Sequence, residues 1–259
     1  MNMEQYNNAD KLNTRIKIHE KYSENKQNFH AWVFENLHLK EEMKILECGC
    51  GPGALWYNNK NKIPNGCEIT LLDMSEGMLR AAKDNIGEID NVKFNYINGD
   101  VQNLKFDDCA FDIVIANHML YHVDDIIKAL NELKRVLKID GTIYASTFSL
   151  LHMKELNDLL FTFIPNKLPN TSDRFCLENG AYYMLNVFEN VKLKRHFDCL
   201  KVKSADDLMA YLLSRTKVKK QLDKNMINSI FDIINKTIEK EGYFYIRKDA
   251  ILFLCKREN

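Results

Sequence analysis

The fold of this chain is decided by the stretch Ile45-Leu46-Glu47-Cys48-Gly49-Cys50-Gly51-Pro52-Gly53. A short apolar run comes first, alternate glycines follow it, and a helical segment begins directly afterwards. Because glycine has no Cβ, a turn of this kind lets the backbone approach a ligand closely. The stretch therefore predicts a strand, a ligand-binding turn and a helix, in that order.

The residues around this stretch alternate between short apolar runs and helical patterns. Each apolar run is bounded by Gly, Asn or Asp, as strands commonly are. Such alternation predicts βαβ units around a parallel sheet, and hence an α/β fold. The strands are predicted at 44–48, 68–72, 92–96, 111–116 and 143–148, and the intervening helices at 76–86 and 126–137.

The flanking segments are predicted to be mainly helical. Residues 9–39 are charged and amphipathic, which predicts one or two helices. An apolar helical stretch follows the core at 150–164 and is closed by Pro165 and Pro169. Two late strands are predicted at 191–202 and 243–255, and we expect them to form an antiparallel pair at the sheet edge. The helices between them are predicted at 205–214 and 219–240.

Composition narrows the class of protein. The chain has 259 residues, of which 46% are apolar or aromatic, so it can bury a sizeable core. Lys and Arg together number 36, as do Asp and Glu, so no basic excess favours nucleic acid as a partner. The seven cysteines are scattered, no signal peptide is evident, and no apolar run approaches the roughly 18 residues of a membrane span. We therefore expect a soluble, cytoplasmic protein.

Four motifs resemble, in order, those of class I S-adenosylmethionine-dependent methyltransferases: Glu47-x-Gly49-x-Gly51-x-Gly53, Asp73, Gly99-Asp100 and Phe111-Asp112-Ile113-Val114. Two further stretches are similar to the small-molecule branch (methyltransferase type 11) that includes ubiquinone and menaquinone biosynthesis enzymes: residues 117–123, and residues 133–138 with Gly141. The resemblance covers about residues 44–148. It implies a Rossmann-like, seven-stranded, mostly parallel sheet with an antiparallel last strand, helices on both faces and a helical cover.

The resemblance also implies an activity and a set of site residues. The activity is transfer of a methyl group from S-adenosylmethionine to a small-molecule acceptor, which leaves S-adenosylhomocysteine. The glycine turn would hold the methionine part of the cofactor, Asp73 the ribose and Asp100 the adenine amine. Glu47 would orient the turn or meet the cofactor's amino group through water. The expected cofactor-binding residues are Glu47, Gly49, Cys50, Gly51, Gly53, Asp73, Met74, Asp100, Val101, Asn117 and His118.

Each of these roles has a structural alternative. Asp73 and Asp100 could be turn residues whose side chains bond the local backbone, and Glu47 could be a structural cap. The dinucleotide fingerprint of dehydrogenases needs a glycine three positions after Gly51, where Ala54 stands, so it survives only in its weaker Ala variant. The helix after the glycines is more polar than is usual in the family, and we expect it to be short or partly exposed.

Two histidines are candidates for a general base. Methyl transfer from a sulfonium is an in-line displacement that needs no metal and no covalent residue. His118 and His122 lie just after the fourth predicted strand, at the edge where such sheets bind ligands. Alternatively, His122 caps the next helix or packs under the loop. We expect no metal, because Cys48 and Cys50 belong to the glycine turn and the other histidines lack zinc spacing.

The domain layout that follows is a single methyltransferase domain over residues 1–259. It comprises N-terminal helices at 1–40, a cofactor-binding core at 41–148, and candidate substrate covers at 149–188 and 204–241. Other functions that remain open are an RNA or protein methyltransferase, a non-catalytic S-adenosylmethionine-binding protein and, least favoured, an NAD-dependent oxidoreductase. The identity of the acceptor and the oligomeric state are left open by the sequence.

Overall fold

The computed structural model describes residues 17–164 and 171–258, and these form two compact units. The core unit consists of Gln27–Leu150, Thr171–His196 and Ala250–Asn259, and the helical unit of Met1–Lys26, Leu151–Asn170 and Phe197–Asp249. The expected cover at 149–188 is divided between them, because residues 171–188 belong to the core unit. Part of that cover, 165–170, and residues 1–16 of the expected N-terminal helices lie outside the described residues.

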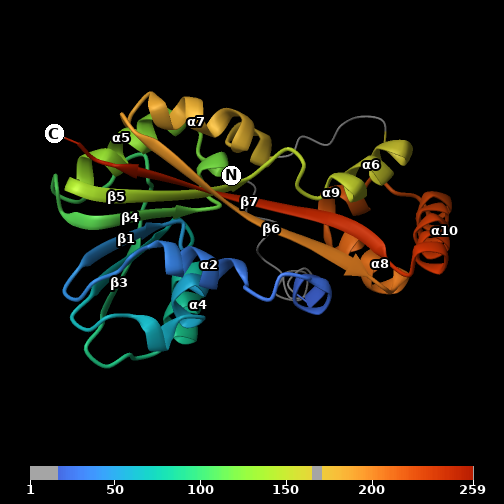
Figure 1. Ribbon diagram of the computed structural model, residues 1–259, viewed down its shortest axis with the longest axis horizontal. Helices are drawn as coiled ribbons and strands as arrows, with labels where there is room; N and C mark the ends of the chain where they lie inside the picture. The colour runs from blue at the N-terminus through green and yellow to red at the C-terminus, as the bar shows by residue number, and fades with distance from the viewer. Residues whose placement is uncertain (1–16, 165–170, 259) are drawn as a thin grey trace. The chain divides into compact units, whose positions relative to one another are not determined.

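One seven-stranded sheet organises the fold (Figure 1), in the order β3-β2-β1-β4-β5-β7-β6. Strands β1 to β5 pair in parallel, and β7 pairs antiparallel with β5. The predicted mostly parallel sheet with an antiparallel last strand is therefore confirmed. The strands are β1 (Lys44–Cys48), β2 (Glu68–Asp73), β3 (Lys93–Asn98), β4 (Phe111–Asn117), β5 (Leu137–Phe148), β6 (Val191–Val202) and β7 (Phe244–Lys256).

Helices cover both faces of the sheet because neighbouring strand residues point to opposite sides. Ile45 packs on the face covered by α2 (Phe29–Asn36), α3 (Ala54–Tyr57) and α4 (Glu76–Ile86), whereas Leu46 packs on the face covered by α5 (Ile126–Val136) and α7 (Leu177–Leu185). The central strands β1, β2 and β4 are almost wholly buried. Each fully buried apolar side chain contributes about 1.5–3 kcal/mol, so these two cores hold the strand ends in place.

Side-chain caps begin the two helices that follow β2 and β4. Ser75 accepts a hydrogen bond from the backbone nitrogen of Met78 at 3.4 Å, and Asp125 accepts one from that of Lys128 at 2.9 Å. Because both caps lie close after strand ends, α4 and α5 start at the carboxyl edge of the sheet. Doubly wound sheets bind their ligands at this edge, where the strand order reverses between β1 and β4.

Strand β5 is longer than predicted. It begins at Leu137 instead of Ile143, and residues 137–142 were expected to end a helix and form a turn. The pairing register with β4 shifts between Phe111 and Ile113, and Asp140 takes a φ of +63°. Such an irregularity lets a strand continue through residues that read as a turn. The helix after the glycines, α3, is short as expected, although its Leu55 and Trp56 are buried.

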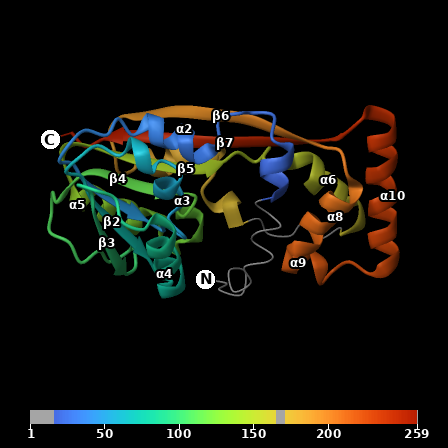
Figure 2. The ribbon, with the colours of Figure 1, turned by 90° about the horizontal axis from the view of Figure 1, so that it is seen from below.

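The helical unit has a hydrophobic core of its own. The helices α6 (Lys154–Phe163), α8 (Ala205–Ser214), α9 (Thr216–Lys219) and α10 (Lys224–Glu241) gather there (Figure 2). Leu156, Leu208 and Ile230 are fully buried in its core. In the described chain, no helix is both long and apolar enough to cross a membrane.

Candidate functional site

The glycine turn leaves one side of its backbone open. Gly49, Gly51 and Gly53 all have positive φ values, of +66°, +54° and +76°. A Cβ on Gly49 would lie 2.7 Å from Cβ of Met119, and one on Gly53 would lie 2.8 Å from Cδ1 of Ile86, so both sites exclude a side chain. Among the described residues, a Cβ on Gly51 would meet nothing within 4 Å. The space beside Gly51 is therefore the place where a ligand can approach the main chain.

Asp73 ties the end of β2 to this turn. Its Oδ2 accepts a hydrogen bond from the backbone nitrogen of Gly51 at 3.0 Å, and its Oδ1 accepts one from that of Ser75 at 2.9 Å. The alternative role, a side chain that bonds local backbone, is therefore present in the structure. A carboxylate offers about four acceptor positions, so two remain for a ligand. The carboxylate is half-buried beside the open side of the turn.

Glu47 is a buried acid under the glycine turn. Its side chain is 2% exposed; Oε2 accepts from Nε1 of Trp56 at 2.7 Å and Oε1 from Nδ2 of Asn117 at 3.3 Å. Burial, together with the negative charge of Asp73, raises the pKa of Glu47 to about 7. The group therefore carries only a partial negative charge near neutral pH, and a cation brought close to it would draw off the remaining protons.

A chain of hydrogen bonds leads from Glu47 to the end of β4. Asn117, which donates to Glu47, accepts from Oγ of Ser146 at 3.0 Å. The same Oγ accepts from the backbone nitrogen of His118 at 3.1 Å. His118 has a φ of +49°, an uncommon conformation for a residue with a side chain, and such strain gathers at functional sites. The network thus fixes a strained residue at the carboxyl edge of the sheet.

The His118 ring lies among aromatic rings. It stacks on Phe148 with ring centroids 4.0 Å apart, and Phe29 lies 4.6 Å away. Its Nδ1 is buried and has no hydrogen-bond partner in the part of the chain that the structure describes. Burial and the neighbouring His30 lower the pKa of His118 to about 3. The ring is therefore neutral at physiological pH, and the expected general base is a weak one.

His122 lies in the 3₁₀ helix η3 (Leu120–His122) and is half-buried. Burial lowers its pKa, and the positive charge of Arg174 lowers it further. The alternative that His122 caps α5 is wrong, because Asp125 occupies that position. His122 lies shortly after Asn117, the last residue of β4, as its place in the sequence predicted.

The other predicted residues surround the same edge. Asp100 follows β3, where Gln102 donates to its carboxylate from the backbone at 2.9 Å and from the side-chain amide at 3.1 and 3.3 Å. Met74 follows Asp73 and is 53% exposed, whereas Val101 is buried in the sheet's core. The predicted acids Asp73 and Asp100 thus lie at the ends of the neighbouring strands β2 and β3. Val101, in contrast, packs in the hydrophobic core.

The two cysteines of the turn are buried, and burial raises the pKa of both thiols. Both therefore stay protonated at physiological pH. Within the described ranges, no three His, Cys, Asp or Glu side chains are grouped as a metal would require. The glycine spacing, rather than any ligand chemistry, explains why small residues stand at Cys48 and Cys50.

Sequence reasoning missed four side chains of this site. Trp56, Ser146, Phe148 and Phe29 come from α3, β5 and the start of α2. Ser146 carried a signal, because it is a polar residue inside the apolar run 143–148. The aromatic contacts of His118 carried none, since they join segments far apart in the sequence.

Comparison with known proteins agrees with this geometry. Residues 46–145 match the family model described as "Methyltransferase domain". Residues 46–145 of this chain are therefore similar to that domain. The matched residues include β2 to β4, most of β1 and β5, the glycine turn, Asp73, Asp100 and His118.

Among curated relatives, demethylmenaquinone methyltransferase of Staphylococcus aureus is 32% identical over 135 residues, which are 51% of this chain and 55% of that protein. The chain thus matches about half the length of this relative. The solved structure of YcgJ protein from Bacillus subtilis aligns with a TM-score of 0.58 at 17% identity, over 89% of this chain and 98% of that one. Phosphoethanolamine N-methyltransferase 2 of Haemonchus contortus, in complex with phosphomonomethylethanolamine and S-adenosylhomocysteine, aligns with a TM-score of 0.51 at 15% identity, over 89% of this chain and 52% of that one. At these identities the structures show a shared fold.

Proposed function

We propose that this protein transfers a methyl group from S-adenosylmethionine to a small-molecule acceptor. The observation that carries the proposal is the open backbone at Gly51 beside the Asp73 carboxylate, within the methyltransferase domain. These groups fit the cofactor: main chain accessible without a Cβ, a carboxylate with free acceptor positions, and a second carboxylate after the next strand. S-adenosylhomocysteine bound to the Haemonchus contortus enzyme, which shares the fold, supports the choice of cofactor.

The residues of the chain would divide the work as follows. Asp73 accepts hydrogen bonds from the ribose hydroxyls, and Asp100 accepts one from the adenine amine. Glu47, about half ionised near pH 7, holds the turn and draws the cofactor's amino group towards it. When bound, the cofactor supplies an electrophilic methyl carbon on a sulfonium, so the protein needs only to hold the acceptor in line and exclude water.

On the acceptor side, we propose that His118 binds rather than deprotonates. Its ring is neutral, with a pKa near 3, and so keeps one unprotonated nitrogen. Nδ1 is buried and has no hydrogen-bond partner among the described residues, so a local opening would bring it to the acceptor. Such a group can hold a hydroxyl or amine of the acceptor without taking its proton fully. The Staphylococcus aureus relative is a demethylmenaquinone methyltransferase, and the Haemonchus contortus protein, whose fold is similar, is a phosphoethanolamine N-methyltransferase. For the acceptor of this chain we propose the class of small molecules.

Binding of S-adenosylhomocysteine, measured by calorimetry, tests this function. Replacement Asp73→Asn removes the charge but keeps the shape, and losing charge-assisted hydrogen bonds of roughly 1.5–3 kcal/mol should weaken binding about tenfold or more. Asp84→Asn removes an exposed acid of α4 and serves as the control. Unchanged affinity in a folded Asp73→Asn protein would refute the ribose role, and no binding to the wild type would refute the cofactor.

A further inference from the structure

The connection between β3 and β4, residues 99–110, is held against α5 by side chains from both partners. Near its start, Nε2 of Gln102 donates to both oxygens of Asp100, and Oε1 of Gln102 accepts from the backbone nitrogen of Asp125 at 3.0 Å. The amide of Gln102 therefore bridges the Asp100 carboxylate and the first turn of α5. Because Oε1 is taken by an N–H donor, the amino end of the amide must face Asp100.

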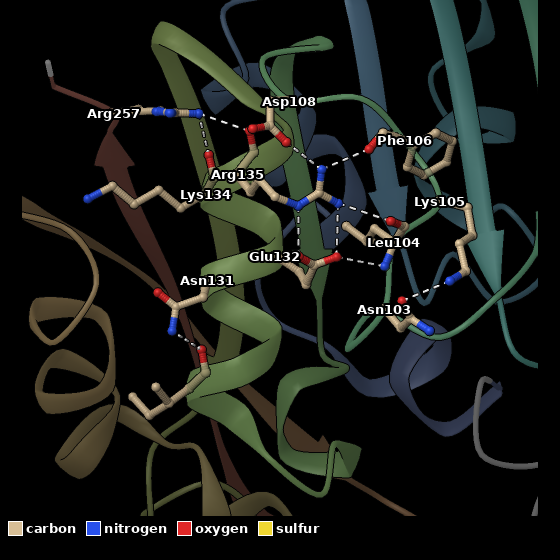
Figure 3. A network of polar contacts seen from close by, with 11 residues as sticks. Asn103, Leu104, Lys105, Phe106, Asp108, Asn131, Glu132, Lys134, Arg135 and Arg257 are labelled. Carbon is tan, nitrogen blue, oxygen red and sulfur yellow. Dashed lines mark hydrogen bonds and ion pairs between the residues drawn. The ribbon is translucent and has the colours of Figure 1, made fainter.

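The second half of the connection is held independently (Figure 3). Arg135 donates from its guanidinium to the carbonyl oxygens of Leu104 and Phe106 at 3.0 and 2.8 Å, and to Asp108 at 2.7 Å. Glu132 accepts from the backbone nitrogen of Leu104 at 2.8 Å. These bonds do not involve Gln102, so the connection stays attached to α5 when the Gln102 amide is removed.

The Gln102 amide restricts the orientation of the Asp100 carboxylate. Without the amide, the side chain of Asp100 keeps one backbone donor, the nitrogen of residue 102 at 2.9 Å from Oδ1. Its Oδ2 would then have no donor among the described residues and could turn towards solvent. With the amide in place, both oxygens are held. Oδ1 then accepts from two donors and Oδ2 from one, so Oδ2 keeps an acceptor position for a further donor.

We propose that Gln102 is a positioning residue that sets recognition of the cofactor's base by aiming the Asp100 carboxylate at the exocyclic amine of adenine. The inference rests on the proposed function, which places that amine at Asp100. Gln102 does not need to touch the cofactor. Its contribution appears as preference for a base that carries the amine over a base that lacks it.

The test compares two ligands: S-adenosylhomocysteine and its analogue whose base is purine, with hydrogen in place of the 6-amino group. Gln102→Ala should weaken the first about fivefold to tenfold, the loss of about one hydrogen bond, and weaken the second less than twofold. Asn103→Ala is the matched control, because the Asn103 side chain is exposed and, within the described ranges, accepts only from Nζ of Lys105, at 3.0 Å. It should leave both affinities unchanged.

The outcomes separate the inference from the function on which it rests. Equal weakening of both ligands by Gln102→Ala would show that Gln102 merely holds the connection, and would overturn the inference while leaving the proposed function intact. A wild-type protein that binds both ligands equally, with Asp100→Ala leaving that ratio unchanged, would overturn the role of Asp100 and the inference with it. Failure of the wild type to bind S-adenosylhomocysteine would overturn the cofactor itself.

Discussion

At the scale of single residues, Glu47 makes the stability of the core unit depend on pH. Its pKa in the folded chain is about 7, above the ordinary value of 4.5, because burial disfavours the anion. The protonated form therefore stabilises the fold, fully below pH 4.5, and this contribution is lost as pH rises through 7. A difference of this size corresponds to roughly 3 kcal/mol.

Glu47→Gln should remove that dependence, because an amide cannot ionise. We expect the variant to be more stable than the wild type above pH 8, and the advantage to vanish as pH falls below 5. Denaturant unfolding at several pH values measures it. The control is Glu76→Gln, since Glu76 is an exposed acid of α4. Parallel pH profiles for wild type and Glu47→Gln would contradict the prediction.

At His118, the function that we propose conflicts with the stability of the fold. A buried nitrogen without a partner costs about 1–3 kcal/mol, and Nδ1 of His118 is such an atom as far as the described residues go. His118→Phe replaces it by carbon in a ring of similar size among Phe29 and Phe148. We expect a higher thermal unfolding temperature. A lower one would mean that the nitrogen stabilises the fold.

The same histidine separates acceptor binding from proton transfer. Once an acceptor is identified by a methyl-transfer screen, His118→Asn should raise KM for it about tenfold and leave the affinity for S-adenosylhomocysteine within a few-fold. A group with a pKa near 3 gives no inflection between pH 5.5 and 9. If instead kcat falls about 10²–10⁴-fold and an inflection near pH 6.5 disappears, His118 is a base. His122→Asn run in parallel shows which histidine is used.

At the scale of elements, the α5 helix is the support on which the connection 99–110 rests. Its C-terminal end is itself held, because Nη1 of Arg257 donates to the carbonyl oxygens of Lys134, Arg135 and Leu137. Arg135 in turn pairs with both oxygens of Glu132. Arg135 therefore joins α5, where it bonds Glu132, to two carbonyl oxygens of the connection.

Arg135→Lys keeps the charge but loses the planar fork, which a lysine cannot replace. We expect unfolding to become easier by about 2 kcal/mol and the melting temperature to fall by about 4–8 °C. Limited proteolysis should cut first within residues 103–108. Lys128→Gln, at an exposed position of α5, is the control. A melting temperature equal to that of the wild type would show that the remaining contacts hold the connection unaided.

The sequence predicted elements best where local pattern and tertiary environment agree. The ranges 44–48 and 205–214 were predicted without error, because a buried apolar run and a capped helix carry their signals locally. The early start of β5 was not predicted, since pairing with β4 and β7 overrides the turn residues around Gly141. Among the candidate site residues, the acids at the strand ends were predicted from their order along the chain. Gln102 was not, because its role depends on where α5 begins.

At the scale of the whole molecule, each unit is built from more than one stretch of the chain. The helical unit is assembled from three stretches, and β6 and β7 each contribute residues to both units. The sequence predicted the segments 149–188 and 204–241 as substrate covers, which stays a prediction. Residues 165–170 lie outside the described ones.

Hydrogen exchange tests this prediction directly. We expect α6, α8 and α10 to gain protection when S-adenosylhomocysteine and an acceptor bind together, because covering segments order over their ligand. Strand β1 should be protected equally in all states and serves as the internal reference. Equal protection of the three helices in all states would remove the cover role and leave them as a separately packed unit.

The position of β7 has a consequence for biosynthesis. One edge of β5 pairs with β4, and the other edge pairs with β7. Strand β5 ends at Phe148 and β7 begins at Phe244, so all the residues from α6 to α10 are made between the two strands. While the ribosome is still making those helices, that second edge of β5 has no strand beside it. An unpaired apolar edge is a template for aggregation. The nascent chain is therefore most in need of a chaperone during this interval, and early termination within it would leave an aggregation-prone fragment.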